Sequence, residues 1–264
     1  MLKTISKAID FSGLAYQNPA DIESTLKGKA ELFRWIENKE TDTQAFICSD
    51  DEAAWVSFRG TEFDGPDKLK DLKTDLNFKL VPGHYGAEHK GFGIGCRSVY
   101  ARIMSHLIRY RLNGLPIYVV GHSLGGGLGE NFCARALLYN QPASKLFTIG
   151  SPRTMSRATA EIFGNLWGHN IYAVVNNNDI VTRIPPRVFD YSHVLNRTLY
   201  YLTEAGKLIT EPGQWELFLD RVKGRFYDFG EFGSDGIKDH SQSNYMKIWQ
   251  KLIKLNGEKE NAID

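Results

Sequence analysis

The residues most able to do chemistry lie in the pentapeptide Gly121–Gly125, which reads GHSLG. This GxSxG pattern predicts a nucleophile elbow, in which Ser123 occupies a sharp turn between a strand and a helix. The apolar run at 117–120 and the helical pattern at 130–139 provide the two flanks that such a turn requires. The serine hydroxyl would attack an acyl carbon, and the N-terminus of the helix would favour the negative charge that develops beside it.

A serine attacks efficiently only when a histidine takes its proton and an acid fixes the orientation of that histidine. In proteins with this elbow the acid and the histidine follow the serine along the chain, which leaves His169, His193 and His240. We expect His240 to be the base, because it lies just before a predicted helix and far enough along the chain to cross the sheet edge. His193 is the alternative, and we interpret it as a hydrogen-bonded structural residue.

The acid should follow the carboxyl end of a strand, where parallel sheets bind their ligands. Asp179 follows the apolar run at 171–175 and meets this condition. The alternative interpretation is an aspartate that only shapes a turn. We expect Asp179 to hold the histidine.

The segments around these residues alternate between extended and helical patterns. Such alternation predicts a mainly parallel central sheet flanked by helices, which is an α/β fold. The expected strands cover residues 32–37, 44–49, 53–58, 115–120, 145–150 and 171–175. The expected helices are marked by Leu2, Ile5 and Ile9, by Pro19, and by Cys96, Val99, Ile103 and Leu107.

Shorter patterns follow toward the end of the chain. Runs at 198–202 and 207–211 flank a turn at 204–206 and predict a hairpin. A short amphipathic helix is expected around 215–222, and a C-terminal helix is expected around 245–252.

Composition places the chain among folded globular proteins. Its 264 residues are 42% hydrophobic and 24% charged, which excludes a disordered or fibrous class. No repeat or linker divides the chain, so we expect a single domain over residues 1–264. The formal net charge of +1 and the dispersed Lys and Arg residues give no basic patch for nucleic acid. No run of about 18 apolar residues predicts a transmembrane segment.

The cysteines Cys48, Cys96 and Cys133 cannot all pair and lack the spacing of a zinc site. We interpret them as buried small apolar residues. No cluster of His, Cys and acidic residues has ligand spacing, so we expect neither a metal nor another cofactor. The N-terminal residues lack the continuous apolar core of a secretory signal, which leaves the compartment open between the cytoplasm and secretion.

Seven short blocks occur in this order along the chain: VSFRGT, DLKTDLNF, HKGF, GHSLGG, FTIGSPR, VVNNNDIVTRIPP and YSH. Together, and in this order, they resemble the class 3 lipase family, the group of the fungal lipases. The resemblance implies the α/β-hydrolase fold and a triad of Ser123, Asp179 and His240. It also implies an oxyanion hole formed by Thr61 and the backbone N–H of Leu124. A tetrahedral oxyanion needs two such donors, one from an early loop and one after the nucleophile.

The same resemblance places a lid at about residues 62–75. Phe63, Leu69 and Leu72 are its candidate apolar residues for substrate access. Lysines and aspartates fill many of the other positions, so the segment offers little apolar surface to a lipid interface. We therefore expect activity on dissolved short and medium acyl esters, without a steep rise in rate at the solubility limit.

These observations predict a serine ester hydrolase that cleaves fatty acyl esters such as acylglycerols through an acyl-enzyme intermediate. A triacylglycerol lipase or another carboxylic ester hydrolase fits this prediction. The expected partner is a lipid or acyl-ester substrate, and a transient contact with a lipid interface is compatible with it. Two alternatives remain. The same fold could serve as a binding module without turnover, or the same triad could act as a phospholipase or acyltransferase.

Overall fold

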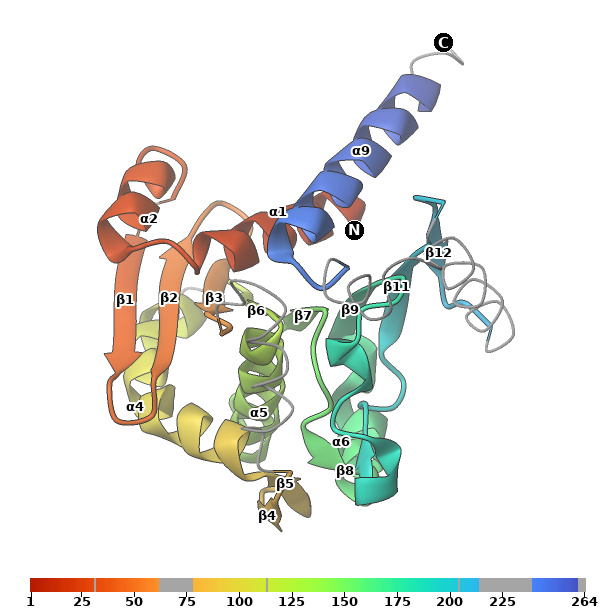
Figure 1. Ribbon diagram of the computed structural model, residues 1–264. Helices are drawn as coiled ribbons and strands as arrows, with labels where there is room; N and C mark the ends of the chain where they lie inside the picture. Colours follow the sequence, from red (N-terminus) through yellow and green to blue (C-terminus); the bar gives the residue numbers. More distant parts are fainter. Residues whose placement is uncertain (31, 62–77, 113, 204, 214–238, 261–264) are drawn as a thin grey trace.

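A central sheet of eight strands organises the part of the chain that the structure describes (Figure 1). The computed structural model describes residues 1–30, 32–61, 78–112, 114–203, 205–213 and 239–260. In spatial order the strands are β1 (Leu32–Asn38), β2 (Thr43–Ser49), β3 (Ala54–Phe58), β6 (Ile117–His122), β7 (Lys145–Ile149), β9 (Ile171–Asn176), β11 (Thr198–Leu202) and β12 (Leu208–Thr210).

The neighbouring strands β3, β6, β7, β9 and β11 run parallel to one another, and antiparallel strands complete both edges of the sheet. β1, β2 and β3 form an antiparallel meander, and β11 and β12 form a hairpin. The inner parallel strands are short and almost fully buried, as expected for a sheet covered on both faces. The predicted meander, parallel sheet and hairpin are therefore confirmed.

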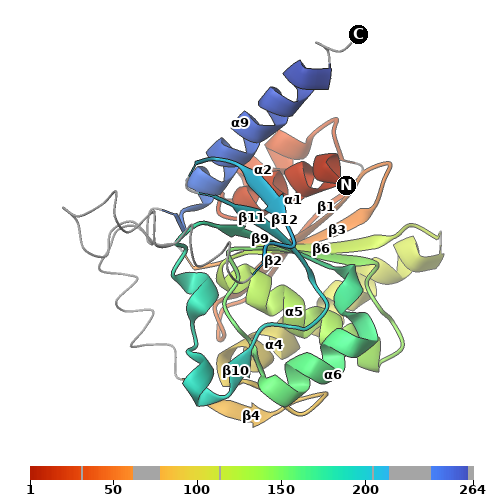
Figure 2. The same ribbon diagram turned by 90° about the vertical axis from the view of Figure 1, so that its right-hand side faces the viewer.

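Helices cover both faces of this sheet (Figure 2). One face carries the three helices that follow β5, β6 and β8, and the opposite face carries the N-terminal and C-terminal helices, which pack against each other. The helices of the first face are α4 (Lys90–Leu112), α5 (Leu124–Leu138) and α6 (Arg157–Trp167). Those of the second face are α1 (Leu2–Leu14), α2 (Pro19–Leu26) and α9 (Gln242–Glu260).

Each face of the sheet has its own apolar core. The predicted helical stripe of Cys96, Val99, Ile103 and Leu107 is buried under the first face. On the second face, Trp55 of β3 packs among residues of α1 and α9. Each such side chain contributes roughly 1.5–3 kcal/mol when it is fully buried. The two cores therefore fix the sheet between its helical layers.

The start of α2 agrees with the sequence pattern. Pro19 is the first helical residue, and the Asn18 side chain accepts a hydrogen bond from the backbone N–H of Asp21 at 3.0 Å. An N-cap side chain followed by proline is a favoured way to begin a helix. The predicted second helix is confirmed.

A second, four-stranded sheet lies beside the main one and has the order β10-β8-β5-β4. The sequence patterns do not predict it, because its strands are only two or three residues long and too short to show a period. Its strands are β4 (Leu80–Pro82), β5 (Ala87–His89), β8 (Met155–Ser156) and β10 (Tyr191–Ser192). Three short 3-10 helices complete the elements: η1 (Gly168–Asn170), η2 (Val181–Arg183) and η3 (Arg187–Phe189).

Two predicted segments lie outside the described residues. They are the lid at about 62–75, with Phe63, Leu69 and Leu72, and the helix expected around 215–222.

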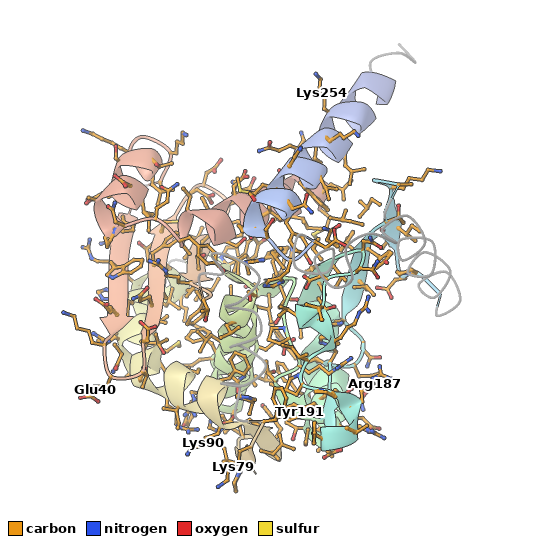
Figure 3. The ribbon with its side chains drawn as sticks, viewed as in Figure 1. Glu40, Lys79, Lys90, Arg187, Tyr191 and Lys254 are labelled. Carbon is orange, nitrogen blue, oxygen red and sulfur yellow. The ribbon has the colours of Figure 1, made fainter. Side chains whose placement is uncertain are left out.

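The three cysteines are buried and unpaired, as the sequence analysis expects. Within the described ranges, no helix has both the length and the apolar character needed to cross a bilayer. Charged side chains lie on the outside of several elements, as Glu40, Lys79 and Lys254 illustrate in Figure 3.

Candidate active site

Ser123 occupies the junction between β6 and α5 with an unusual backbone conformation. Its φ is 56° and its ψ is −128°, a combination that costs a residue with a side chain about 1–3 kcal/mol. The glycines on either side make the turn sterically possible. A Cβ atom on Gly121 would collide with the backbone of Gly125, and one on Gly125 would collide with the carbonyl of Phe58. The surrounding backbone therefore holds Ser123 in a conformation that presents its hydroxyl.

A chain of hydrogen bonds runs from Ser123 through His240 to Asp179. The Nε2 atom of His240 lies 2.8 Å from Ser123 Oγ, and its Nδ1 atom lies 3.0 Å from each carboxylate oxygen of Asp179. All three side chains are at most 1% exposed. Because a carboxylate only accepts hydrogen bonds, Nδ1 carries the proton and Nε2 is the nitrogen that can accept one from the serine. This is the arrangement that general-base activation of a hydroxyl requires.

Two further donors fix the carboxylate of Asp179. The Tyr245 hydroxyl donates to Oδ2 at 2.6 Å, and the backbone N–H of Val181 donates to Oδ1 at 2.8 Å. Burial and the neighbouring Asp179 raise the pKa of Tyr245 well above its usual value. The phenol therefore keeps its proton and acts as a donor. This role could not be identified from the sequence, because Tyr245 also fits the apolar face of a helix.

The segment that carries His240 is tied to the loop that carries Asp179. Oδ2 of Asp239 accepts hydrogen bonds from the backbone N–H of Asn178 at 3.0 Å and from Asn177 Nδ2 at 3.2 Å. The side-chain amide of Asn176 donates to the carbonyl of Asp239 at 2.9 Å. These bonds cross about sixty residues of sequence, so no local pattern could have indicated them.

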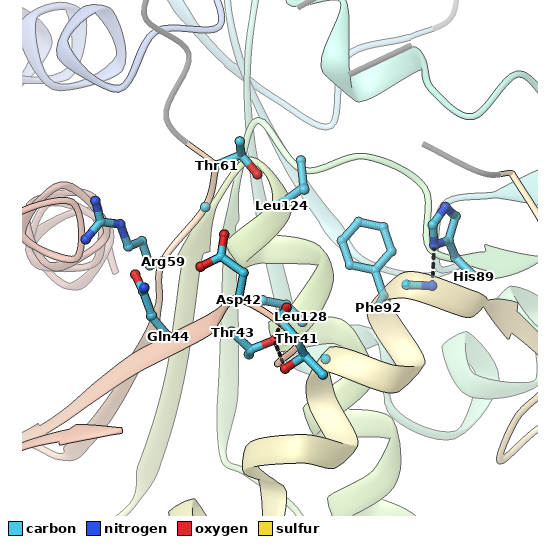
Figure 4. A pocket seen from close by; sticks show the side chains of 13 residues that line it. Thr41, Asp42, Thr43, Gln44, Arg59, Thr61, His89, Phe92, Leu124 and Leu128 are labelled. Atoms are coloured by element: carbon cyan, nitrogen blue, oxygen red, sulfur yellow. Dashed lines mark hydrogen bonds between the residues drawn. The ribbon is translucent and has the colours of Figure 1, made fainter. Parts of the chain in front are cut away.

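The two predicted oxyanion donors lie at the same edge of the sheet as Ser123. Thr61 follows β3, which is the parallel neighbour of β6, and its side chain is exposed. Leu124 is the first residue of α5, where a backbone N–H has no acceptor in a preceding helical turn. Both residues line a pocket of about 540 Å³ (Figure 4).

This pocket has walls of different character. Phe92, Leu124 and Leu128 form its apolar side, whereas Asp42 of the β1–β2 turn, Gln44 of β2 and Arg59 after β3 supply polar side chains (Figure 4). The pocket therefore lies directly beside the candidate oxyanion donors Thr61 and Leu124. Ser123 itself is fully buried.

His193, the alternative base in the sequence analysis, has both ring nitrogens engaged elsewhere. Its Nε2 donates to the carbonyl of Thr182 at 2.7 Å, and its Nδ1 accepts from Arg197 at 3.0 Å. Burial and the nearby guanidinium groups of Arg197 and Arg153 lower the pKa of His193 well below its usual value. The structure therefore gives His193 the contacts of a neutral, hydrogen-bonded residue.

No metal centre is evident in the described ranges, where no group of three or more His, Cys, Asp or Glu side chains is arranged to hold an ion.

Comparison with known proteins relates this chain to lipases. The family model described as Lipase (class 3) matches residues 55–189, just over half of the chain. The secreted mono- and diacylglycerol lipase MDL3 of Malassezia globosa is 30% identical over 115 residues, covering 42% of this chain and 38% of that protein. The chain spans half or less of the length of three such secreted lipases from this organism.

Solved lipase structures share the fold. The mono- and diacylglycerol lipase from Aspergillus oryzae matches with a TM-score of 0.66 at 21% identity, covering 81% of this chain and 86% of its own. A mutant form of MDLA from Penicillium cyclopium matches with a TM-score of 0.71 at 18% identity, covering 92% and 97%. These likenesses and the mainly parallel sheet show that the chain has the α/β-hydrolase fold.

Proposed function

The chain belongs to the class 3 lipase family, and we propose on that premise that it is a serine ester hydrolase acting on fatty acyl esters such as acylglycerols. The observation that carries the proposal is the continuous hydrogen-bonded chain of Ser123, His240 and Asp179 at a nucleophile elbow. A fold hosts many activities, so this geometry supports the proposed activity more specifically than the fold does.

In the proposed acylation step, Ser123 Oγ attacks the ester carbonyl carbon while Nε2 of His240 takes the hydroxyl proton. Asp179 stabilises the resulting imidazolium through its bond to Nδ1. The tetrahedral intermediate collapses, the bond from carbon to the alcohol oxygen breaks, and His240 returns its proton to the departing alcohol. The acyl group is then esterified to Ser123.

Deacylation repeats these steps with water. His240 takes a proton from a water molecule, and the hydroxide attacks the acyl carbon. The second tetrahedral intermediate releases the fatty acid, and Ser123 regains its proton from His240. The proton first taken from Ser123 leaves with the alcohol, and a proton from water replaces it on Ser123, so a turnover consumes one ester and one water.

Both intermediates carry a negative charge on the former carbonyl oxygen. The backbone N–H of Leu124 and the Thr61 residue are our proposed donors to it. Preorganised donors of this kind are commonly worth about 10²–10³ in rate. Thr61 and Leu124 line one pocket, which supports their joint role.

The test combines covalent labelling with turnover. We expect a fluorophosphonate to form one adduct on Ser123, and p-nitrophenyl esters of graded chain length to be hydrolysed. Ser123→Ala should abolish the adduct and lower kcat about 10³-fold or more. Ser105→Ala, at an exposed serine of α4, is the matched control and should retain both properties. If wild-type protein forms no adduct at Ser123 and hydrolyses none of the esters, the result would instead support a binding module.

A further inference from the structure

The ring of His122 lies against the ring of His240. The two centroids are 4.7 Å apart, and the planes are inclined by 25°. Nε2 of His122 lies 2.8 Å from the backbone carbonyl of His240, so this nitrogen must be the protonated one and must donate. Nδ1 of His122 is then an acceptor, and it receives a hydrogen bond from the Tyr16 hydroxyl at 2.8 Å.

The Tyr16 hydroxyl also touches the segment that carries Thr61. A Cβ atom on Gly60 would collide with Tyr16 Oη and would lie 2.6 Å from the carbonyl of His122. Gly60 directly precedes Thr61. The Tyr16 hydroxyl therefore contacts both Gly60, next to the candidate oxyanion residue, and His122, which is hydrogen-bonded to the backbone of His240.

Other hydrogen bonds fix helix α1, which ends just before Tyr16. The Ser57 hydroxyl of β3 donates to the carbonyl of Phe11 at 3.0 Å. Gln242 Nε2, at the start of α9, donates to the carbonyl of Ile9 at 2.9 Å. Ile9 is buried in the core of this face. Helix α1 is thus bonded to both segments that Tyr16 connects.

From these contacts we propose that Tyr16 and His122 form a positioning pair that sets the backbone of His240 and aligns its ring with Ser123 and the Thr61 segment. This inference rests on the proposed ester hydrolysis. Hydrogen bonds join the two residues to each other and to His240, and Tyr16 also lies against Gly60, so each acts through His240 or through Gly60.

The neutral state of His122 is compatible with the positive charge that forms on His240 during the reaction. His240 becomes positively charged during each step, and a second charged imidazole stacked on it would oppose this. Burial, together with His240, lowers the pKa of His122 well below its usual value. Among the described residues, the titratable groups that face His122 are Tyr16, which lies just after α1, His240, and Tyr245 of α9, whose ring centroid is 5.7 Å away. None of them is a carboxylate, so His122 remains neutral beside the base.

Two isosteric variants of His122 separate its two hydrogen bonds. His122→Gln places an amide nitrogen where Nε2 lies and keeps the donor to His240. His122→Asn can keep an acceptor for Tyr16 but loses that donor. If positioning of His240 is the role, the Gln variant should retain several-fold more kcat than the Asn variant, with KM similar in both.

Tyr16→Phe removes only the hydroxyl and should lower kcat about 3- to 10-fold, since one neutral hydrogen bond contributes modestly. Tyr118→Phe, on the neighbouring strand β6, is the matched control and should retain wild-type kcat. The proton resonance of His240 Nδ1, in its bond to Asp179, should shift in Tyr16→Phe and stay in place in Tyr118→Phe. A merely structural role would leave this resonance unchanged.

Wild-type kcat and an unshifted resonance in Tyr16→Phe, or equal activity of the two His122 variants, would overturn the proposal. Failure of the proposed function has a different signature, because the wild-type protein would then neither hydrolyse esters nor react with fluorophosphonate at Ser123.

Discussion

The hydroxyl of Tyr245 lies 2.6 Å from Oδ2 of Asp179 and also accepts a hydrogen bond from the backbone N–H of Asn176 at 2.9 Å. Tyr245 belongs to α9, and His240 lies just before that helix. One C-terminal segment therefore supplies both the candidate base and a donor to the candidate acid. This arrangement makes the relative position of acid and base depend on the docking of a single helix.

Tyr245→Phe should lower kcat about 10-fold, because the Asp179 carboxylate loses a donor that helps to orient it. The free energy of unfolding of the variant should also fall by about 1–3 kcal/mol, because the buried N–H of Asn176 loses its acceptor. Steady-state kinetics and urea unfolding measure the two effects. Tyr118→Phe is again a suitable control. An unchanged kcat would show that the other bonds to Asp179 suffice to orient it.

The two candidate histidines should differ sharply when each is removed. His240→Ala should lower kcat about 10³-fold or more without a large change in KM. His193→Asn should leave kcat within a few-fold of wild type and mainly reduce thermal stability, because it disrupts bonds to Thr182 and Arg197. Near-normal turnover in His240→Ala would move the base to another residue.

Thr61 should act through its hydroxyl as well as its backbone. Thr61→Val preserves shape but removes the hydroxyl, so kcat should fall about 10- to 10³-fold with KM nearly constant. Thr61→Ser keeps the hydroxyl and is the matched control, with kcat close to wild type. If Thr61→Val changes KM alone, Thr61 binds substrate rather than stabilising the oxyanion.

Much of the fold could be predicted from the sequence because its inner strands are continuous apolar runs. The apolar run at 117–120 is short and bounded by turn residues, which favours a strand, whereas the spacing of Cys96, Val99, Ile103 and Leu107 fits one face of a helix. The second sheet could not be predicted, because pairs such as Tyr191 with Ser156 form between segments too short to show a period.

The candidate site divides in the same way. Ser123 and Asp179 each follow an apolar strand. Because parallel strands end at a common edge of the sheet, their proximity could be predicted. The contacts of His122 could not be predicted from sequence. Its contacts with Tyr16 and His240 span more than a hundred residues. They depend on how α1 packs on the sheet.

Buried histidines should make the fold sensitive to acid. Burial lowers the pKa of His89 to about 4, and burial also lowers those of His122 and His193. An unfolded histidine titrates near 6.5, so below that pH the unfolded chain takes up protons that the folded chain does not. The free energy of unfolding should therefore fall as pH drops from about 6.5 toward 4. Each such group contributes about 1.4 kcal/mol per pH unit within its own window.

Two acidic groups oppose this trend. Burial raises the pKa values of Glu130 and Asp10, so the folded chain binds those protons more readily and recovers some stability as pH falls. Burial also lowers the pKa of a fourth histidine, His84, and among the described residues the four histidines outweigh the two acids, which leaves a net loss toward acid. His89→Asn isolates one contribution, because its side-chain oxygen can replace Nδ1 as the acceptor of the Gly91 N–H. Urea unfolding between pH 7 and 4.5 should show a shallower decline for this variant than for wild type. His106→Asn changes an exposed histidine and should keep the wild-type slope. Equal slopes in all three proteins would mean that His89 titrates alike in the folded and unfolded states.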